Sequence, residues 1–173
     1  MPRVGDFRRT STLAVDKVEM GGKYVGKKTY WRLYAIENLY RILIHSVLLA
    51  EFGTNWWATV TSKKKQKDII KLQERYKNSP WPSSPGDHEI YYIYLSDLNK
   101  IVGENVERFR PVIQDIDDVI LNIEKIGLSR NVIAHMNFPS RTDRERIDSA
   151  HEYIKKMFLS VEKSRVLELR IPS

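Results

Sequence analysis

Three residues near the middle of the second half of the chain have types and spacing that suit chemistry on a phosphodiester. Arg130 and Asn131 are adjacent, and His135 follows Asn131 by four residues, so Asn131 and His135 would share one face of a helix. Arg130 lies about 100° away around such a helix, but its long side chain can reach back. A permanent cation, a neutral polar group and an imidazole that titrates near neutral pH can bind a phosphate and move protons. The alternative is structural, because histidines in helices are often buried and hydrogen-bonded.

A long helix is predicted before this motif. Apolar side chains recur at helical spacing over residues 29–52, at Leu33, Ile36, Tyr40, Leu43 and Val47. Gly53 can take the left-handed backbone conformation that ends a helix. Further apolar positions widen the stripe, so we expect this helix to be buried on more than one side.

Further helices are predicted between residues 63 and 126. The run 63–78 is a basic amphipathic helix by its periodicity. Residues 90–95 are rich in aromatic side chains and are predicted to be extended, and Ser96 can cap a helix that reaches about Arg110. Pro111 suits the first turn of the next helix.

The motif is predicted to lie on a short helix of its own. Gly127 is expected to break or kink the preceding helix. If Ser129 caps the short helix, the motif occupies its first turns, where free amides and the helix dipole favour an anion. Residues 142–145 fit a capping box for a last helix. The prediction is an all-α, up-and-down bundle of four to five main helices.

Three segments follow from these patterns. A basic N-terminal arm comprises residues 1–28, the helical domain residues 29–165, and a C-terminal tail residues 166–173. The alternating apolar residues of the arm, from Leu13 to Met20, predict either a short strand or a partly ordered segment.

The motif Arg130-Asn131-x3-His135 resembles the R-x(4–6)-H signature of the HEPN superfamily, in its R-N-x3-H form. The flanks agree over about residues 29–160, with an acid inside the first long helix (Glu37), then Gly53-x2-Trp-Trp, then Tyr92-x4-Asp-Leu-x2-Ile. The pattern is similar to HEPN domains related to the C-terminal domain of the nuclear messenger-RNA surveillance endonuclease. The resemblance implies an HEPN-like bundle.

The resemblance also implies a homodimer that joins two motifs in one cleft and cleaves RNA without a metal or another cofactor. The ribose 2′-hydroxyl would attack the adjacent phosphate and leave a 2′,3′-cyclic phosphate and a 5′-hydroxyl. His135 would act as general base or acid together with the same residue of the second copy, and Arg130 would stabilise charge on the phosphoryl oxygens. Asn131 would orient the phosphate or the imidazole. Glu37 would support these groups from behind, or pair with Arg41, which is the simpler interpretation.

Such an enzyme would fit a toxin or phage-defence effector that is neutralised by an antitoxin or another regulatory protein. The sequence departs from one toxin pattern, R-x4-H-x-Y, because Asn137 stands where the tyrosine would receive nucleotides. Two alternatives remain open. One is a non-catalytic HEPN module that binds RNA or a protein partner through the same cleft, and the other is a structural dimerisation domain.

The amino-acid composition excludes several kinds of site. The chain has 173 residues, no cysteine, 29 lysines and arginines, and 22 aspartates and glutamates, with a formal charge of +7. Without cysteine it has no disulfide, thiol nucleophile or cysteine-ligated zinc. No uninterrupted apolar run approaches the ~20 residues of a membrane span, so we expect a cytoplasmic protein without a membrane partner.

Basic residues gather in two places, and each could attract a polyanion such as RNA. The net charge is +4 over residues 1–28 and +5 over residues 63–77, while the rest of the chain is slightly acidic. We predict that the second group binds RNA through Lys63, Lys64, Lys65 and Lys67. The alternative is a solvated helix face.

Two other patterns resemble known sites but lack the residues or the spacing that those sites need. Residues 21–29 come close to the phosphate-binding loop G-x4-G-K-[ST], but Lys28 stands where a hydroxyl must bind magnesium, and Thr29 follows one residue late. Asp87, His88 and Glu89 are consecutive and do not readily converge on one metal ion, so no metal site is expected.

Overall fold

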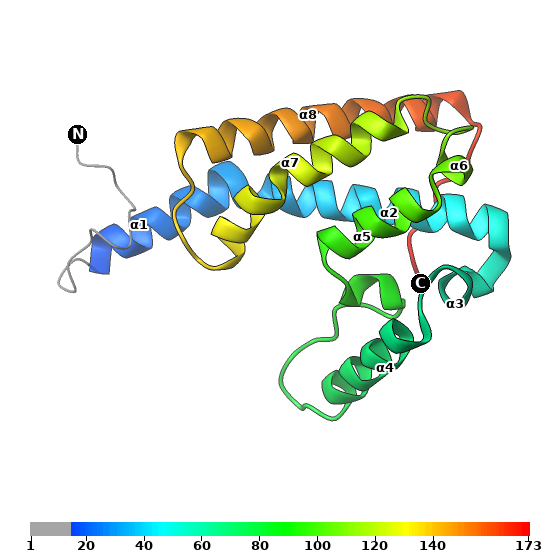
Figure 1. Ribbon diagram of the computed structural model, residues 1–173. Coiled ribbons are helices and arrows are strands. Elements are labelled where there is room, and N and C mark those ends of the chain that lie inside the picture. The colour runs from blue at the N-terminus through cyan, green and yellow to red at the C-terminus, as the bar shows by residue number, and fades with distance from the viewer. Residues whose placement is uncertain (1–14) are drawn as a thin grey trace.

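The computed structural model describes residues 15–173, and within this range the chain is helical with no strand (Figure 1). The bundle consists of α2 (Trp31–Phe52), α5 (Leu95–Glu104), α7 (Ile116–Ala134) and α8 (Arg141–Ser164). Helix α2 packs on α5 and α8, and α7 packs on the same two helices. The all-α bundle predicted from the sequence is confirmed.

The direction of the helices is set by the long connection between α2 and α5. This connection contains η2 (Gly53–Asn55), α3 (Trp56–Val60), α4 (Lys63–Lys77) and η3 (Glu89–Tyr92), and it returns the chain from the end of α2 to a point near its middle (Figure 1). Helices α2, α5 and α8 therefore run the same way, and α7 runs against them after the short helix α6 (Val106–Phe109). The antiparallel pair α5 and α7 forms the groove described below.

Helix α2 is the centre of the core. Its fully buried side chains include Ile36, Tyr40, Leu43, Ile44 and Leu48, which cover more than one side of the helix, as predicted. Each such side chain contributes about 1.5–3 kcal/mol by leaving water. Gly53 ends the helix with a φ of +69°, where its N–H donates to the Leu49 carbonyl, and this position was also predicted.

One buried polar chain ties three helices together. The Tyr40 hydroxyl on α2 donates to Asn99 Oδ1 on α5 at 2.9 Å, and Asn99 Nδ2 donates to the carbonyl of Ile120 on α7 at 3.2 Å. Burial raises the pKa of Tyr40 well above its ordinary value, so the hydroxyl keeps its proton. The Tyr40 hydroxyl, the Asn99 amide and the Ile120 carbonyl are thus all hydrogen-bonded. This network sets how α5 and α7 lie on α2.

The N-terminal arm is helical where it is described, so the predicted strand is wrong there. Helix α1 (Val15–Val25) continues through one π-helical turn, η1 (Gly26–Tyr30), directly into α2. The Tyr24 ring stacks on Phe138 with centroids 5.7 Å apart, which holds the segment against the chain beyond α7. Residues 21–29 are thus helix rather than a phosphate-binding loop. Leu13 and the rest of residues 1–14 lie outside the described residues.

Several predicted boundaries are wrong, because other residues nearby begin these elements. Residues 89–92 form a 3-10 turn instead of an extended segment, and α5 starts at Leu95, before Ser96. Helix α7 begins at Ile116, five residues after Pro111. Helix α8 is capped by Ser140, whose Oγ accepts from the Asp143 N–H at 3.1 Å while the Asp143 carboxylate accepts from the Ser140 N–H.

The C-terminal tail returns to the bundle. The Arg170 N–H donates to Ser46 Oγ on α2 at 2.8 Å, and the Tyr91 hydroxyl donates to the Pro172 carbonyl at 3.2 Å. Residues 166–173 therefore fasten η3 to α2 rather than hang free.

One window within the helical stretch Val18–Val60 is long and apolar enough to cross a membrane, with a mean hydropathy of 1.2. The window is 50% buried inside the bundle, and the core helix of a soluble protein has the same length and composition. The expectation that no segment approaches a membrane span therefore needs this one correction.

Candidate functional site

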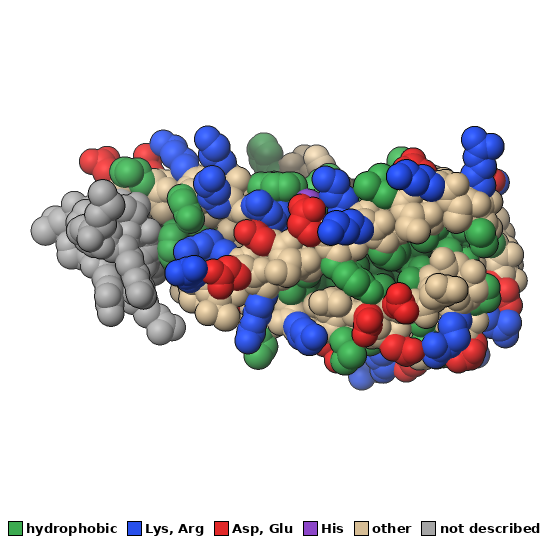
Figure 2. Space-filling model, turned by 90° about the horizontal axis from the view of Figure 1, so that it is seen from above, with side chains coloured by type: hydrophobic (Ala, Val, Ile, Leu, Met, Phe, Trp, Pro, Cys, Tyr) green, Lys and Arg blue, Asp and Glu red, His purple; other side chains and the backbone are tan. Residues whose placement is uncertain are grey.

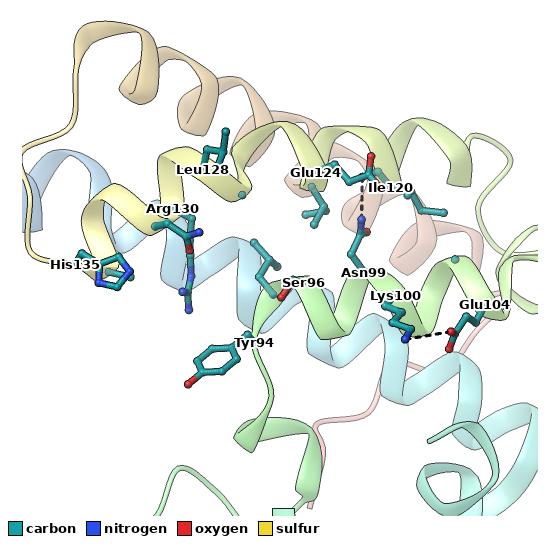
Figure 3. Close-up of a pocket in the computed structure, with 16 residues that line it drawn as sticks. Tyr94, Ser96, Asn99, Lys100, Glu104, Ile120, Glu124, Leu128, Arg130 and His135 are labelled. Atoms are coloured by element: carbon teal, nitrogen blue, oxygen red, sulfur yellow. Dashed lines mark hydrogen bonds and ion pairs between the residues drawn. The ribbon is translucent and has the colours of Figure 1, made fainter. Parts of the chain in front are cut away.

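The predicted motif lies in a groove between α5 and α7 (Figure 3). The groove has a volume of about 1030 Å³ and is lined by residues 94–104 on one side and residues 120–135 on the other. Arg130, Asn131 and His135 all line it, so the structure brings the three predicted site residues together. In Figure 3, Arg130 and His135 project from α7 toward the end of the groove that Tyr94 borders.

The motif occupies the end of its helix, and the prediction that Ser129 caps a short helix is wrong. Helix α7 runs unbroken through Gly127 to Ala134. Ser129 is 1% exposed, and its Oγ donates to Asp143 Oδ1 on α8 at 2.7 Å. His135 is the residue that ends the helix, and its N–H donates to the Asn131 carbonyl. At this end the dipole of α7 disfavours an anion, the opposite of the expectation.

Positive potential in the groove must therefore come from elsewhere. Arg130 supplies it beside His135, while Lys100, also in the groove, lies 3.7 Å from Glu104. Helix α5 assists because its first residues, Leu95 and Ser96, line the groove at the positive end of that helix. Asp97 fixes this helix start, since its Oδ2 accepts from the Tyr94 N–H at 3.3 Å. The other oxygen, Oδ1, lies 2.8 Å from Lys65 Nζ.

Arg130 is held from behind by Glu37. Arg130 Nη2 lies 3.6 Å from Glu37 Oε1, and Arg41 Nη2 lies 3.5 Å from the same oxygen. Arg41 also donates to the carbonyls of Ile90 and Ile93, and burial lowers its pKa, an effect that Glu37 opposes. Both interpretations of Glu37 therefore apply at once, because it pairs with Arg41 and also reaches the motif arginine.

Tyr94 is a groove residue that the sequence interpretation missed. Its ring centroid lies 5.7 Å from the Arg130 guanidinium carbon, and the residue is 66% exposed. A cation over an aromatic face is attracted to it. The available signal was the aromatic run Tyr91-Tyr92-Ile93-Tyr94 directly before a helix, which was interpreted as an extended segment.

The reactive end of the groove is open to solvent. Asn131 and His135 are both exposed, and Leu128, one turn before Asn131, is 78% exposed. Within the described residues, no side-chain hydrogen bond orients the His135 imidazole. A single copy thus offers one exposed imidazole per groove, beside an apolar side chain that nothing in the described chain covers.

The four predicted RNA-binding lysines lie apart from the motif. Lys63, Lys64 and Lys67 are exposed on α4, whereas Lys65 pairs with Asp97 and supports the start of α5. None of the four lines the groove as the described residues form it. Figure 1 places α4 outside the four-helix bundle, on the side of η3.

Charge is mixed on the face of the molecule that α8 covers. Seen from the side of α8, positive and negative side chains are interspersed along the described part of the molecule (Figure 2). The face that α8 forms therefore has no large patch of one sign among its described residues.

The other histidines are packed in the core. His45, His88 and His151 are buried. His45 Nδ1 accepts from the Trp56 indole N–H at 3.2 Å, and His88 Nδ1 accepts from the Ile90 N–H. Over residues 15–173 no group of three or more metal-ligating side chains is placed to hold a metal ion.

Comparison with known proteins adds no relative. No protein-family model matches the chain, and neither a curated protein nor a solved structure matches it. Any function must therefore be argued from the groove and its residues.

Proposed function

We propose that this protein is a homodimeric, HEPN-type endoribonuclease that cleaves RNA without a metal at a site shared by two copies. One observation carries the proposal: Arg130, Asn131 and His135 meet in one groove, and Glu37 braces the arginine from the core side. The resemblance of the motif to the HEPN signature supplies the reaction class.

The reaction is an internal transfer at phosphorus. The 2′-oxygen forms a bond to the adjacent phosphorus while the bond from phosphorus to the 5′-oxygen breaks. One imidazole accepts the 2′-hydroxyl proton, and a second donates a proton to the departing 5′-oxygen. Arg130 stabilises the negative charge that gathers on the other two phosphoryl oxygens. The products are a 2′,3′-cyclic phosphate and a 5′-hydroxyl.

This chemistry uses two imidazoles, and each groove has one. A second copy that faces the first across the open end of the groove would supply the other from its own His135. The exposed apolar Leu128 beside the motif supports such an interface.

Cleavage assays on RNA in the presence of a chelator test the reaction. His135→Ala and Arg130→Ala should abolish cutting, while Arg141→Ala, which changes an exposed arginine outside the groove, should not. End-group analysis should find a 2′,3′-cyclic phosphate. Unchanged cutting by His135→Ala, or a product with a 3′-hydroxyl, would contradict the mechanism.

Native mass measurement tests the dimer. Leu128→Asp should convert a dimer into a monomer, because an interface cannot bury an unpaired carboxylate at low cost. Leu159→Asp, at an exposed leucine on α8, is the matched control and should leave the mass unchanged. A wild-type monomer at working concentration would refute the shared site.

A second candidate is a non-catalytic module that binds RNA or a protein partner in the same groove. It is favoured by the position of the motif at the negative end of α7 and by the unbraced His135 imidazole. This candidate predicts RNA binding that weakens as salt rises, with no cleavage by the wild type. If the protein is the endoribonuclease, we propose that it acts as a toxin or phage-defence effector and that an antitoxin or another regulatory protein controls it.

A further inference from the structure

Tyr94 is placed where it can meet a substrate. It stands at the start of α5, lines the groove, and keeps 66% of its surface exposed. Its ring lies beside the Arg130 guanidinium at the same end of the groove as His135 (Figure 3). A phosphate bound by Arg130 would thus have a flat aromatic ring next to it.

The exposed ring is not needed to build the fold. The contact that starts α5 is made by the Tyr94 backbone N–H with Asp97, and Lys65 holds that carboxylate. A side chain that leaves most of its apolar surface in water gains little by burial. The ring contacts Arg130, but that contact leaves most of it open.

A nucleotide presents both chemical groups that this pair suits. Its phosphate takes charge-assisted hydrogen bonds from an arginine, and its base has a flat π-face that stacks on tyrosine. Stacking on a protein ring requires a base that is free of its neighbours, as in single strands, loops and bulges. A paired base inside a duplex does not offer its face.

We propose that Tyr94 stacks on an unpaired base of the substrate, next to the phosphate that Arg130 binds, so that the groove selects single-stranded RNA. This inference rests on the proposed function for the identity of the ligand. It adds a base-binding residue and a substrate class that the motif does not specify.

Binding to uncleavable RNA tests the inference separately from catalysis. The probes are a single-stranded 2′-O-methyl oligonucleotide, which lacks the attacking hydroxyl, an abasic strand of the same backbone and length, and the corresponding duplex. Tyr94→Ala should weaken binding of the base-bearing strand by about 5- to 150-fold and leave the abasic strand unchanged. Tyr94→Phe should bind like the wild type. Trp81→Ala, at an aromatic residue 91% exposed in the loop after α4, should also bind like the wild type.

The outcomes separate the two proposals. Equal weakening of the base-bearing and abasic strands would mean that Tyr94 only positions Arg130, and it would overturn the stacking. Unchanged binding by Tyr94→Ala, tighter binding of the duplex, or no binding by the wild type would overturn it too. A change of native mass in Tyr94→Ala would make the residue a subunit contact and overturn the inference. If the wild type never cuts RNA but the base-dependent loss appears, the base site stands and the nuclease proposal fails.

Discussion

Glu37 Oε1 on α2 lies 3.6 Å from Arg130 Nη2 on α7, although 93 positions separate the two residues in the chain. The same oxygen lies 3.5 Å from Arg41 Nη2, and Arg41 in turn binds the carbonyls of Ile90 and Ile93. The carboxylate thus links the motif to the segment that leads into Tyr94. Since all three charged side chains are mostly buried, their geometry is fixed more firmly than that of a surface ion pair.

Glu37→Gln should therefore lower the rate of RNA cleavage more than RNA affinity. The amide keeps the shape but removes the charge that aims Arg130, and a misplaced transition-state contact costs about 10- to 100-fold in rate. Single-turnover rates and the affinity for uncleavable RNA measure the two effects. Glu145→Gln, in the exposed pair with Arg141, is the control. An equal loss of rate and affinity would contradict a positioning role.

The lysines of α4 should divide into two functions. Replacement of Lys63, Lys64 and Lys67 by glutamine should weaken RNA binding. If each lysine meets a phosphate, the negative slope of log affinity against log salt should become shallower by about 2. The rate of the bound-state chemical step should change less than the affinity. A salt slope equal to that of the wild type would show that these lysines do not touch RNA.

Lys65→Gln should behave differently from that triple variant, because Lys65 binds Asp97 rather than solvent. We expect a loss of about 0.5–1 kcal/mol in unfolding free energy, typical of a partly exposed ion pair, and slower cleavage through a looser start of α5. Denaturant unfolding and the salt slope distinguish the two groups. A changed salt slope without a change in stability would assign Lys65 to RNA binding after all.

Ser129→Ala should lower the free energy of unfolding by about 1.5–3 kcal/mol, since Ser129 Oγ donates to a charged acceptor, Asp143. Burial alone would raise the pKa of Asp143, but hydrogen bonds from Ser140 and Ser129 outweigh it and hold that pKa below its ordinary value. Ser149→Ala, at an exposed serine of α8, should cost far less. Equal stability of the two variants would show that the bond between α7 and α8 is unimportant.

Stability should fall as the pH drops toward 4, because His45 is held neutral in the core. Burial, together with His88 and Arg170, lowers the pKa of His45 from 6.5 to about 4. Between these values the unfolded chain binds a proton that the folded chain does not, so the free energy of unfolding decreases with falling pH by up to about 3 kcal/mol. A protonated imidazole also cannot accept the Trp56 N–H bond.

Denaturant unfolding at about pH 7 and about pH 5 measures this dependence. His45→Gln keeps a hydrogen-bond acceptor for Trp56 but does not titrate, so its loss of stability over the same interval should be smaller. His88 has its pKa lowered by burial as well and contributes in the same direction. The same pH dependence in His45→Gln and the wild type would exclude His45 as the source.

The sequence by itself determined the all-α class and the central helix. The apolar spacing from Leu33 to Val47 is sufficient to define α2, because a helix with that stripe must be buried, and Gly53 ends it for a local backbone reason. The spacing of Asn131 and His135 likewise places these two on one face of any helix. These features depend on residues within a few turns of one another, where helical geometry decides which side chains are neighbours.

The tertiary structure alone decided which way the motif faces and what surrounds it. Ser129 has the local character of a cap, yet it lies inside α7 because Asp143 offers a stronger partner across the bundle. Lys65 likewise has the local character of a solvated lysine, yet it forms an ion pair with Asp97 of another helix. Such contacts join residues far apart in the chain, and their energies exceed the weak local preferences that sequence patterns report. Tertiary packing therefore formed the groove, paired Arg130 with Glu37 and left Tyr94 exposed.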